Sequence, residues 1–236
     1  MTFCLGRLPH SPERLARGLM SAPAPMLYRY QLDRSAIDYQ PGLWGNGTIP
    51  DCTAVGVANA ALASGLLRSA TPVITDGKPQ ALYADVIGMP GASDAQLAAT
   101  DGAMAMDMLN DVATHGFDAG QQVPLVPIPR TVPNSREAIA GLMCNRLLGV
   151  AYLGIRLYQG DMDTFGQGPW VAPIAASGAL VGGHVLLAWD YPVGLADADL
   201  TRLATWAALQ PASWAWIMER LDETHGLEWP QLKAAA

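Results

Sequence analysis

The longest run of small and apolar residues follows position 52 and predicts a helix from Thr53 to Arg68. Apolar or small side chains fall on nearly every side of this helix, which is typical of a buried helix and not of one on the surface. Gly56, Ala60 and Ala63 carry little or no side chain, so neighbouring backbones can approach closely here. We therefore expect other elements to enclose this helix.

Two further helices are predicted along the chain. Over residues 100–117, apolar side chains recur at helical spacing, and Gly116 is placed to end the helix. Over residues 134–148, either Asn134 or Ser135 can cap the first turn of the next helix. The segment 71–79 reads as a turn-rich loop. Residues 120–133 hold four prolines and are predicted to lack regular structure.

Strand patterns dominate the second half of the chain. Residues 149–158 alternate in polarity and predict a strand, and 178–192 predict a strand pair or one long strand. Within 200–223 the first half can form a strand, and the part from Ser213 predicts a helix. Helices precede strands, so we expect an α+β domain with a helical half packed on a mostly antiparallel sheet.

The domain organisation follows from size and proline content. A chain of 236 residues, half of them hydrophobic, is long enough to bury one core of ordinary size. No linker separates two apolar halves, so residues 46–236 are predicted to form a single domain. Five prolines interrupt residues 1–45, which are predicted to form an extended arm that is ordered only where it packs on something.

Charge and cysteine content exclude several classes of protein. The formal net charge is −7 with only 14 lysines and arginines, so we expect no direct nucleic-acid partner. The three cysteines show no metal-ligand spacing, so we expect no disulfide framework, metal or other cofactor, and synthesis in a reducing, intracellular compartment. The N-terminus lacks a signal-peptide core, and the longest uncharged apolar stretch, 53–67, is too short for a membrane span.

One cysteine has a chemical rationale. Cys52 directly precedes the buried helix, where the positive end of the helix dipole favours a thiolate. His184 follows two glycines, opens an apolar strand, and lies about 130 residues downstream, a spacing known for cysteine nucleophiles and their histidine bases. The alternative is that Cys52 is a buried inert thiol and His184 a core histidine bonded to a carbonyl. His10, His115 and His225 are expected at loops or helix ends.

Several segments together resemble papain-like-fold proteins of tailed bacteriophages and prophages. The matching segments are "LGRLP", "GNGTIPDC", "DGAMAMDML", "GGHVLLAWDY" and "TWAALQPASWAWI", which together span most of the chain. The resemblance implies the papain-like cysteine-peptidase fold and a phage origin, often in a particle-building context. It also implies that Asn46, six residues before Cys52, stands where the family's glutamine supplies an oxyanion-hole N–H; the alternative is a turn residue in "GNG".

The sequence also departs from the papain-like pattern. Ala204 falls where the family has the amide that orients the histidine, and Gln210 or Asp190 could replace that amide. Asp51 can cap the helix, but its charge opposes thiolate formation at the adjacent cysteine.

Two classes of function follow. The first is a bacteriophage virion structural protein, a capsid decoration (cement) protein or a head or tail attachment, with a degenerate Cys52–His184 pair. It would be made in the host bacterial cytoplasm, reside in the virion, and contact other virion proteins or copies of itself. The altered site and the arm favour this class. The second is an active cysteine peptidase or amidase, in which Cys52 attacks a peptide or amide carbonyl, His184 is the base and Asn46 helps to bind the oxyanion.

Overall fold

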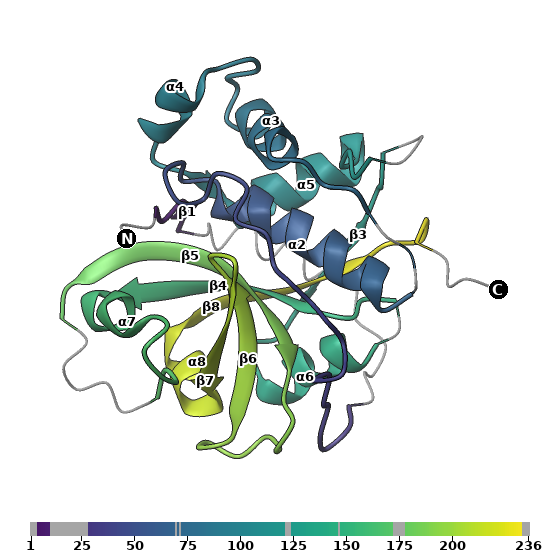
Figure 1. Ribbon diagram of the computed structural model, residues 1–236, viewed down its shortest axis with the longest axis vertical. Helices are drawn as coiled ribbons and strands as arrows, with labels where there is room; N and C mark the ends of the chain where they lie inside the picture. Colours follow the sequence, from purple (N-terminus) through teal and green to yellow (C-terminus); the bar gives the residue numbers. More distant parts are fainter. Residues whose placement is uncertain are drawn as a thin grey trace.

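The structure is a computed structural model that describes residues 4–9, 28–68, 70, 72–120, 124–145, 147–171 and 178–232. Helices α2 to α5 gather on one side of the molecule, and most of the sheet, with α6 to α8, lies on the other (Figure 1). The helices are α2 (Cys52–Leu66), α3 (Gly77–Val86), α4 (Asp94–Ala98), α5 (Ala105–His115), α6 (Arg136–Cys144), α7 (Gln159–Thr164) and α8 (Trp214–Arg220). The expected α+β class is confirmed.

The sheet has eight strands in the order β2-β1-β5-β4-β8-β3, and β6 and β7 continue from β5 as a hairpin. The strands are β1 (Arg7–Leu8), β2 (Ala103–Met104), β3 (Ile128–Val132), β4 (Ala151–Tyr158), β5 (Leu180–Asp190), β6 (Leu200–Thr205), β7 (Ala208–Ser213) and β8 (Leu221–Glu228). Among the described strands only β1 and β2 pair in parallel, so the sheet is mostly antiparallel, as predicted.

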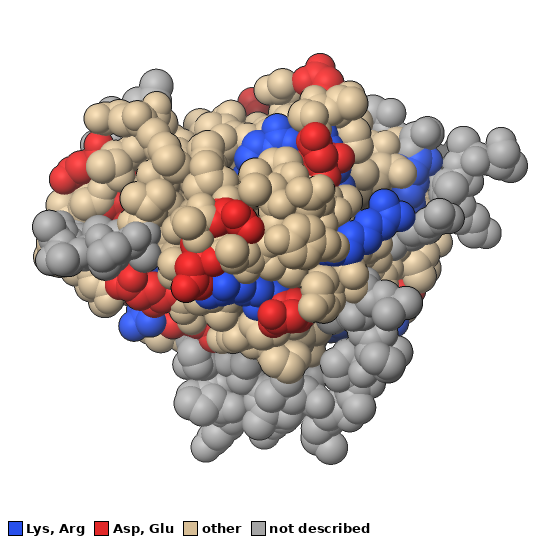
Figure 2. Space-filling view, turned by 90° about the horizontal axis from the view of Figure 1, so that it is seen from below, with Lys and Arg blue, Asp and Glu red and all other residues tan. Residues whose placement is uncertain are grey.

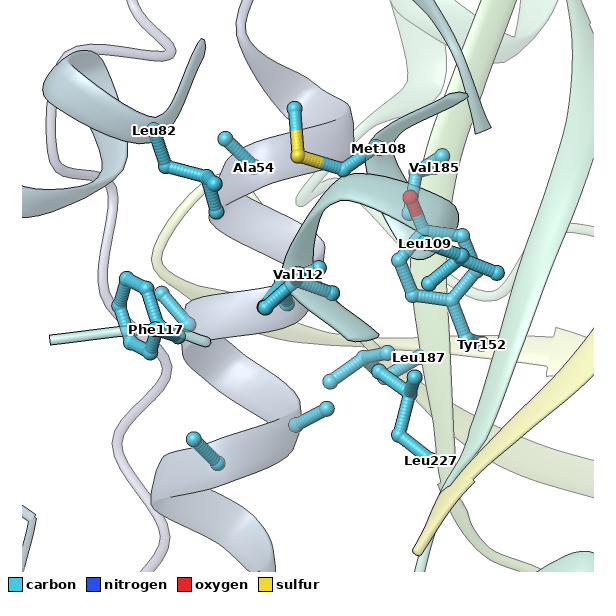
Figure 3. Packing of buried hydrophobic residues seen from close by; sticks show 14 of the residues in the cluster. Ala54, Leu82, Met108, Leu109, Val112, Phe117, Tyr152, Val185, Leu187 and Leu227 are labelled. Carbon is cyan, nitrogen blue, oxygen red and sulfur yellow. The ribbon is translucent and has the colours of Figure 1, made fainter. Parts of the chain in front are cut away.

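Helix α2 is enclosed on nearly every side, as its composition predicts. Buried side chains of α3 and α5 cover one side, and Val185 and Leu187 of β5 cover the other (Figure 3). A Cβ atom added at Gly56 would lie 2.5 Å from Cγ1 of Val185 and 2.8 Å from the ring of Tyr152. The absence of a side chain at position 56 therefore sets the distance between the helix and the sheet.

The sheet separates two hydrophobic clusters. Alternate residues of β5 point to opposite faces, so Val185 and Leu187 join the cluster around α2, while Leu186 and Ala188 join a second cluster. Four tryptophans fill or border this second cluster, and all are buried: Trp170, Trp206, Trp214 and Trp216. Strand β5, which contains His184, therefore contributes to both hydrophobic clusters.

Two predicted loops contain regular structure. Within 120–133, β3 pairs with β8 although it contains Pro129. It is the last strand in the sheet order, and an edge strand tolerates a residue without an N–H group. The predicted loop 71–79 ends inside α3, which begins at Gly77.

The helix predicted over 100–117 begins only at Ala105, because Ala103 and Met104 pair with β1. Gly116 ends it as predicted, with a positive φ of 82°. The helix predicted over 134–148 is present as α6, but it ends at Cys144, before the predicted end. Ser135 is its cap and accepts a hydrogen bond from the Ala138 amide at 3.1 Å.

The described parts of the N-terminal segment lie against the rest of the chain. Arg7 and Leu8 form β1 inside the sheet, and Leu32 pairs with Tyr191. Residues 10–27 of the expected arm lie outside the described residues, so the boundary between an arm and the domain 46–236 remains a prediction.

The surface mixes both signs of charge. On the face in Figure 2, acidic and basic side chains lie close to one another on a largely uncharged surface. None of the helices in the described part of the chain combines the length and the apolar character that a bilayer crossing requires.

The packing at Gly56 gives a first prediction. Gly56→Ala gains about 1 kcal/mol of helix propensity, but the added methyl group meets Val185 and Tyr152, and overpacking costs about 1–3 kcal/mol. We expect a net loss in the free energy of unfolding, measured by urea denaturation followed by circular dichroism. Gly77→Ala is the matched control, since a Cβ atom there meets nothing within 4 Å. Equal stability of the two variants would contradict the packing argument.

Candidate active site

Cys52 is the first residue of α2, at the point where the helix approaches β5. It is 1% exposed. Burial raises the pKa of its thiol to about 12, although the backbone amide groups of Val185 and Gly6, which lie beside the sulfur, favour the thiolate. In this structure Cys52 is a covered, neutral thiol at a helix N-terminus, the position at which a thiolate is electrostatically favoured once water can reach it.

The cover over Cys52 is the N-terminal strand. β1 lies between β2 and β5, and the Gly6 carbonyl accepts a hydrogen bond of 2.7 Å from the Ala103 amide. A Cβ atom at Gly6 would overlap the Pro50 carbonyl, so only glycine fits there without a shift. An extended main chain therefore occupies the space beside the sulfur.

His184 lies inside β5, which begins at Leu180, and is fully buried. Its Nε2 lies 2.7 Å from the Thr205 hydroxyl, and its ring stacks on Trp206 with centroids 4.3 Å apart. Burial, helped by the positive charge of Arg7, lowers the pKa of His184 to about 3. The imidazole is therefore neutral, and its Nδ1 is buried without a hydrogen-bond partner.

The structure brings the two predicted residues to the same place but does not join them. Val185, whose amide lies beside the Cys52 sulfur, is the neighbour of His184 in β5. No hydrogen bond between the Cys52 and His184 side chains occurs in the described part of the molecule. In this structure both side chains are neutral and buried from solvent.

A strained turn holds the aromatic ring against His184. Trp206 and Ala207 connect β6 to β7 with φ values of 42° and 59°, both in the left-handed region. Such two-residue hairpins usually contain asparagine and glycine, and each non-glycine residue here costs about 1–2 kcal/mol. The surrounding structure keeps this strain, and strain of this kind tends to occur at functional sites.

Asn46 and Asp51 lie at the same end of α2. Asn46 lines a cavity of about 10 Å³ together with His184 and Gly56, but its Nδ2 donates to the Ile49 carbonyl at 3.3 Å. Asp51 is the N-cap residue of α2, as expected, but its side chain makes no capping hydrogen bond. Burial raises the pKa of Asp51 to about 8, opposed by the Asn46 side chain. The carboxyl is then largely protonated at pH 7, so it repels a thiolate at Cys52 less than an ionised carboxylate would.

The orienting partner of His184 is a residue that the sequence reasoning missed. Gln210 bonds to the backbone of Gly166 and Gly168, and Asp190 pairs with Arg202, so neither proposed replacement contacts the imidazole. Thr205 takes that place, one residue after Ala204. The signal available in the sequence was a hydroxyl directly before Trp206.

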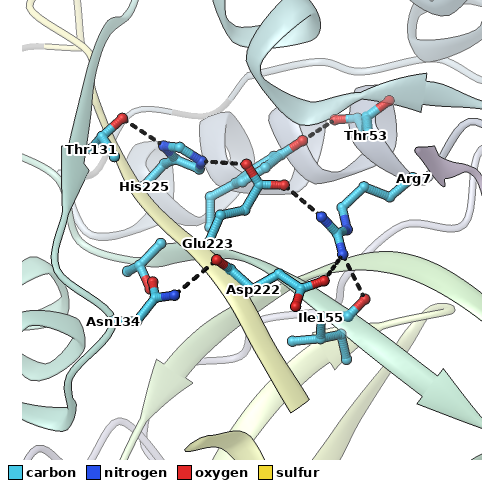
Figure 4. Close-up of polar contacts among 10 residues, drawn as sticks. Arg7, Thr53, Thr131, Asn134, Ile155, Asp222, Glu223 and His225 are labelled. Carbon is cyan, nitrogen blue, oxygen red and sulfur yellow. Dashed lines mark hydrogen bonds and ion pairs between the residues drawn. The ribbon is translucent and has the colours of Figure 1, made fainter. Parts of the chain in front are cut away.

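A buried polar network continues from the cover strand into the sheet (Figure 4). Arg7 donates from Nη1 to Oε1 of Glu223 at 2.8 Å and from Nη2 to Asp222 and to the Ile155 carbonyl. Glu223 also contacts His225 at 3.1 Å. Burial opposes the charge on Glu223, but His225 and Arg7 outweigh it and lower the pKa of Glu223.

The other expected residues fall in different places. His225 is fully buried in β8 and bonds to Thr131 at 3.0 Å, so its expected position at a loop or helix end is wrong. His115 is the last residue of α5, as expected. The thiols Cys4, Cys52 and Cys144 are all unpaired, and Cys144 contacts the Tyr191 hydroxyl at 3.1 Å.

Comparisons with known proteins define the fold. The chain matches no protein-family model and no curated protein sequence. Among solved structures it is similar to xylellain, a cysteine protease from Xylella fastidiosa, at 14% identity and a TM-score of 0.61, covering 98% of this chain and 97% of that one.

Two further neighbours are cysteine proteases in their proforms. The ragweed pollen allergen Amb a 11 has 12% identity and a TM-score of 0.60, with 91% of this chain and 70% of that chain covered. Procathepsin B from Trypanosoma congolense has 11% identity and a TM-score of 0.58, with 97% and 85% covered. The expected papain-like cysteine-peptidase fold is therefore confirmed.

Asp51 gives a prediction about pH. Its pKa is about 8 in the folded protein, against an ordinary value of 3.8. Between pH 3.8 and about pH 8, therefore, the native state holds a proton that the unfolded state has lost. The free energy of unfolding contributed by Asp51 therefore falls as pH rises through that range. Asp51→Asn cannot titrate, so its stability relative to the wild type should increase from pH 4 to pH 8 in urea denaturation.

The control for this experiment is Asp76→Asn, which removes an exposed carboxylate. Its stability relative to the wild type should change little over the same range. A difference between Asp51→Asn and the wild type that stays constant with pH would show that Asp51 is ionised in the folded protein.

Proposed function

We propose that the protein is a cysteine hydrolase of the peptidase or amidase type whose own N-terminal strand holds it in a covered, resting state. The observation that carries the proposal is the course of β1, which places an extended main chain between β2 and β5 with the Gly6 amide beside the Cys52 sulfur. A peptide on the same path would have its backbone at the nucleophile.

The site contains the types of group that this reaction needs: a thiol nucleophile, an imidazole base and donors for the oxyanion. Cys52 would lose its proton to His184 and attack the carbonyl carbon, and His184 would return that proton to the leaving amine. Water then hydrolyses the thioester and restores the thiol. Thr205 and Trp206 hold the imidazole in place, while the Cys52 backbone amide and, after a side-chain rotation, Asn46 would donate to the oxyanion.

The cover explains why the resting pair is neutral. Burial is the largest cause of both pKa shifts, and Arg7 of β1 adds to the shift at His184. Moving β1 aside would admit water, and because burial is the largest cause of the shift at Cys52, the thiol pKa would fall even though Arg7 and the Gly6 amide, which favour the thiolate, would be lost. At His184 hydration and the loss of the Arg7 charge act in the same direction, so the imidazole pKa would rise. The two values would then approach each other, as proton transfer between them requires.

A second candidate is the virion structural protein. The specific observation in its favour is that Cys52 and His184 are buried, neutral and not hydrogen-bonded to each other, as expected of a fold retained for packing. The bacteriophage origin and the place in a virion remain predictions from sequence resemblance. The chain's absence from purified particles of the encoding phage, with presence in infected-cell extract, would end this proposal.

The cover gives a prediction about reactivity. In the wild type, iodoacetamide should modify Cys52 at least tenfold more slowly than the less buried Cys4 and Cys144, measured by mass spectrometry on native protein. Gly6→Ala introduces a Cβ atom that overlaps the Pro50 carbonyl, so β1 should shift and the rate at Cys52 should rise at least tenfold. Gly77→Ala is the control and should leave all three rates unchanged.

The hydrolase proposal itself is tested by turnover in the Gly6→Ala background. Fluorogenic peptide amides should be cleaved, and Cys52→Ala should abolish cleavage. His184→Ala should lower the rate by about 10²–10⁴-fold and remove the reactivity of Cys52 below pH 8.5. In Gly6→Ala, Cys52 could instead react at the same rate as Cys4 and Cys144, with or without His184→Ala. The Cys52–His184 pair would then be inactive, and the virion structural protein would be the better candidate.

A further inference from the structure

We infer that the recess holding Arg7 is a subsite that selects an arginine side chain in the peptide substrate. The inference rests on the proposed function, since it assigns a substrate class to that site. It starts from the fact that the chain's own cover strand fills the recess with a guanidinium group, directly next to Gly6 and the nucleophilic sulfur.

The recess binds the guanidinium from three directions. Oε1 of Glu223 accepts from Nη1 at 2.8 Å, and Asp222 and the Ile155 carbonyl accept from Nη2 (Figure 4). The Arg7 side chain is 1% exposed, so these contacts exclude water. Two carboxylates around one planar cation match the fork-like donor geometry of arginine better than the point charge of lysine.

Glycines give the recess its shape. A Cβ atom at Gly183 would overlap the Arg7 carbonyl and lie 3.1 Å from its Nε, and a Cβ atom at Gly154 would lie 2.5 Å from Cγ of Glu223. Side chains at these two positions would therefore displace Arg7 or Glu223 from the recess. The room for an arginine side chain is built into two strands of the sheet.

Asp222 and Glu223 each use one carboxylate oxygen to contact another residue of the protein, which leaves the second oxygen of each for a ligand. The other oxygen of Asp222 lies 3.0 Å from Nε of Arg156, and the other oxygen of Glu223 contacts His225 at 3.1 Å. These partners hold both carboxylates in position when the guanidinium leaves. A neutral side chain in the recess would leave the free oxygen of Glu223 buried without a donor, and this cost discriminates against it; the Asp222 side chain is 19% exposed and can still reach water.

The surroundings leave room for more of a peptide. A pocket of about 360 Å³ lies along β1 and is lined by Asp101, Arg156, Leu180 and Asp222 among others. An extended peptide that follows β1 with its arginine in the recess would place the adjoining peptide unit beside Cys52, as Gly6 is now. The subsite and the nucleophile are therefore one residue apart along the bound chain.

The test uses two peptides that differ only in charge. Fluorescein-labelled Leu-Gly-Arg-Leu-amide copies the cover strand, and the citrulline analogue replaces the guanidinium with a neutral urea of the same shape. Binding to the Arg7→Ala protein, whose recess lacks its own guanidinium, is measured by fluorescence anisotropy. We expect the arginine peptide to bind at least tenfold more tightly. Gly6→Ala serves as the second protein if Arg7→Ala fails to fold, as judged by circular dichroism.

Two variants in the same background locate the preference. Glu223→Gln keeps the size of the side chain and removes its charge, so the preference for arginine over citrulline should fall to within about twofold. Asp101→Asn removes a carboxylate that lines the same pocket but makes no ion pair with Arg7, and the preference should remain. Equal binding of the two peptides, or a preference that survives Glu223→Gln, would overturn the subsite.

The two proposals fail in different ways. If the Arg7→Ala protein prefers the arginine peptide but Gly6→Ala shows no turnover, the subsite is supported and the hydrolase is refuted. Turnover that depends on Cys52 but is equal for arginine and citrulline substrates supports the hydrolase and refutes the subsite.

Discussion

Enclosure of α2 is the constraint on which the rest of the structure depends. A helix buried on nearly every side cannot shift without a clash, so its small residues and Gly56 fix its distance from β5 and β4. Its first residue, Cys52, is thereby placed against the amide of Val185, the neighbour of His184 in β5. The candidate site therefore owes its geometry to the packing of α2.

The polar groups around this helix end are unusual for a core. Nδ1 of His184, both carboxyl oxygens of Asp51 and the Thr53 hydroxyl are buried without hydrogen-bond partners. Most buried polar groups in native proteins are bonded, and each exception calls for an explanation. Together with the strained turn at Trp206 and Ala207, these groups give the surroundings of Cys52 several features that cost stability.

The sequence predicts those parts of this fold that rest on local periodicity. The helix after Cys52, the strand before Tyr158 and the class of the fold follow from long, consistent patterns. Strand pairing between segments that are far apart in the sequence leaves no periodic pattern of apolar residues. β1 is two residues long and becomes a strand only between β2 and β5, and the proline-bearing β3 is allowed only because it lies at the edge.

The candidate site divides in the same way. Cys52 could be found because it directly precedes a long apolar run that predicts a helix. His184 could be found because it lies between two glycines and an apolar strand pattern. The contacts of Thr205, Arg7 and Glu223 depend on which strands become neighbours, so residue types alone did not indicate them. The spacing of residues located the reactive groups but could not reveal what covers them.

The bond between Arg7 and Glu223 has a consequence for how the chain is made. It joins residues 216 positions apart, so Arg7 finds this partner only after β8 has left the ribosome. Pairing of β1 with β2 and β5 can form earlier, but until β8 emerges the guanidinium lacks the carboxylates of Asp222 and Glu223. The cover over Cys52 is therefore completed late in biogenesis.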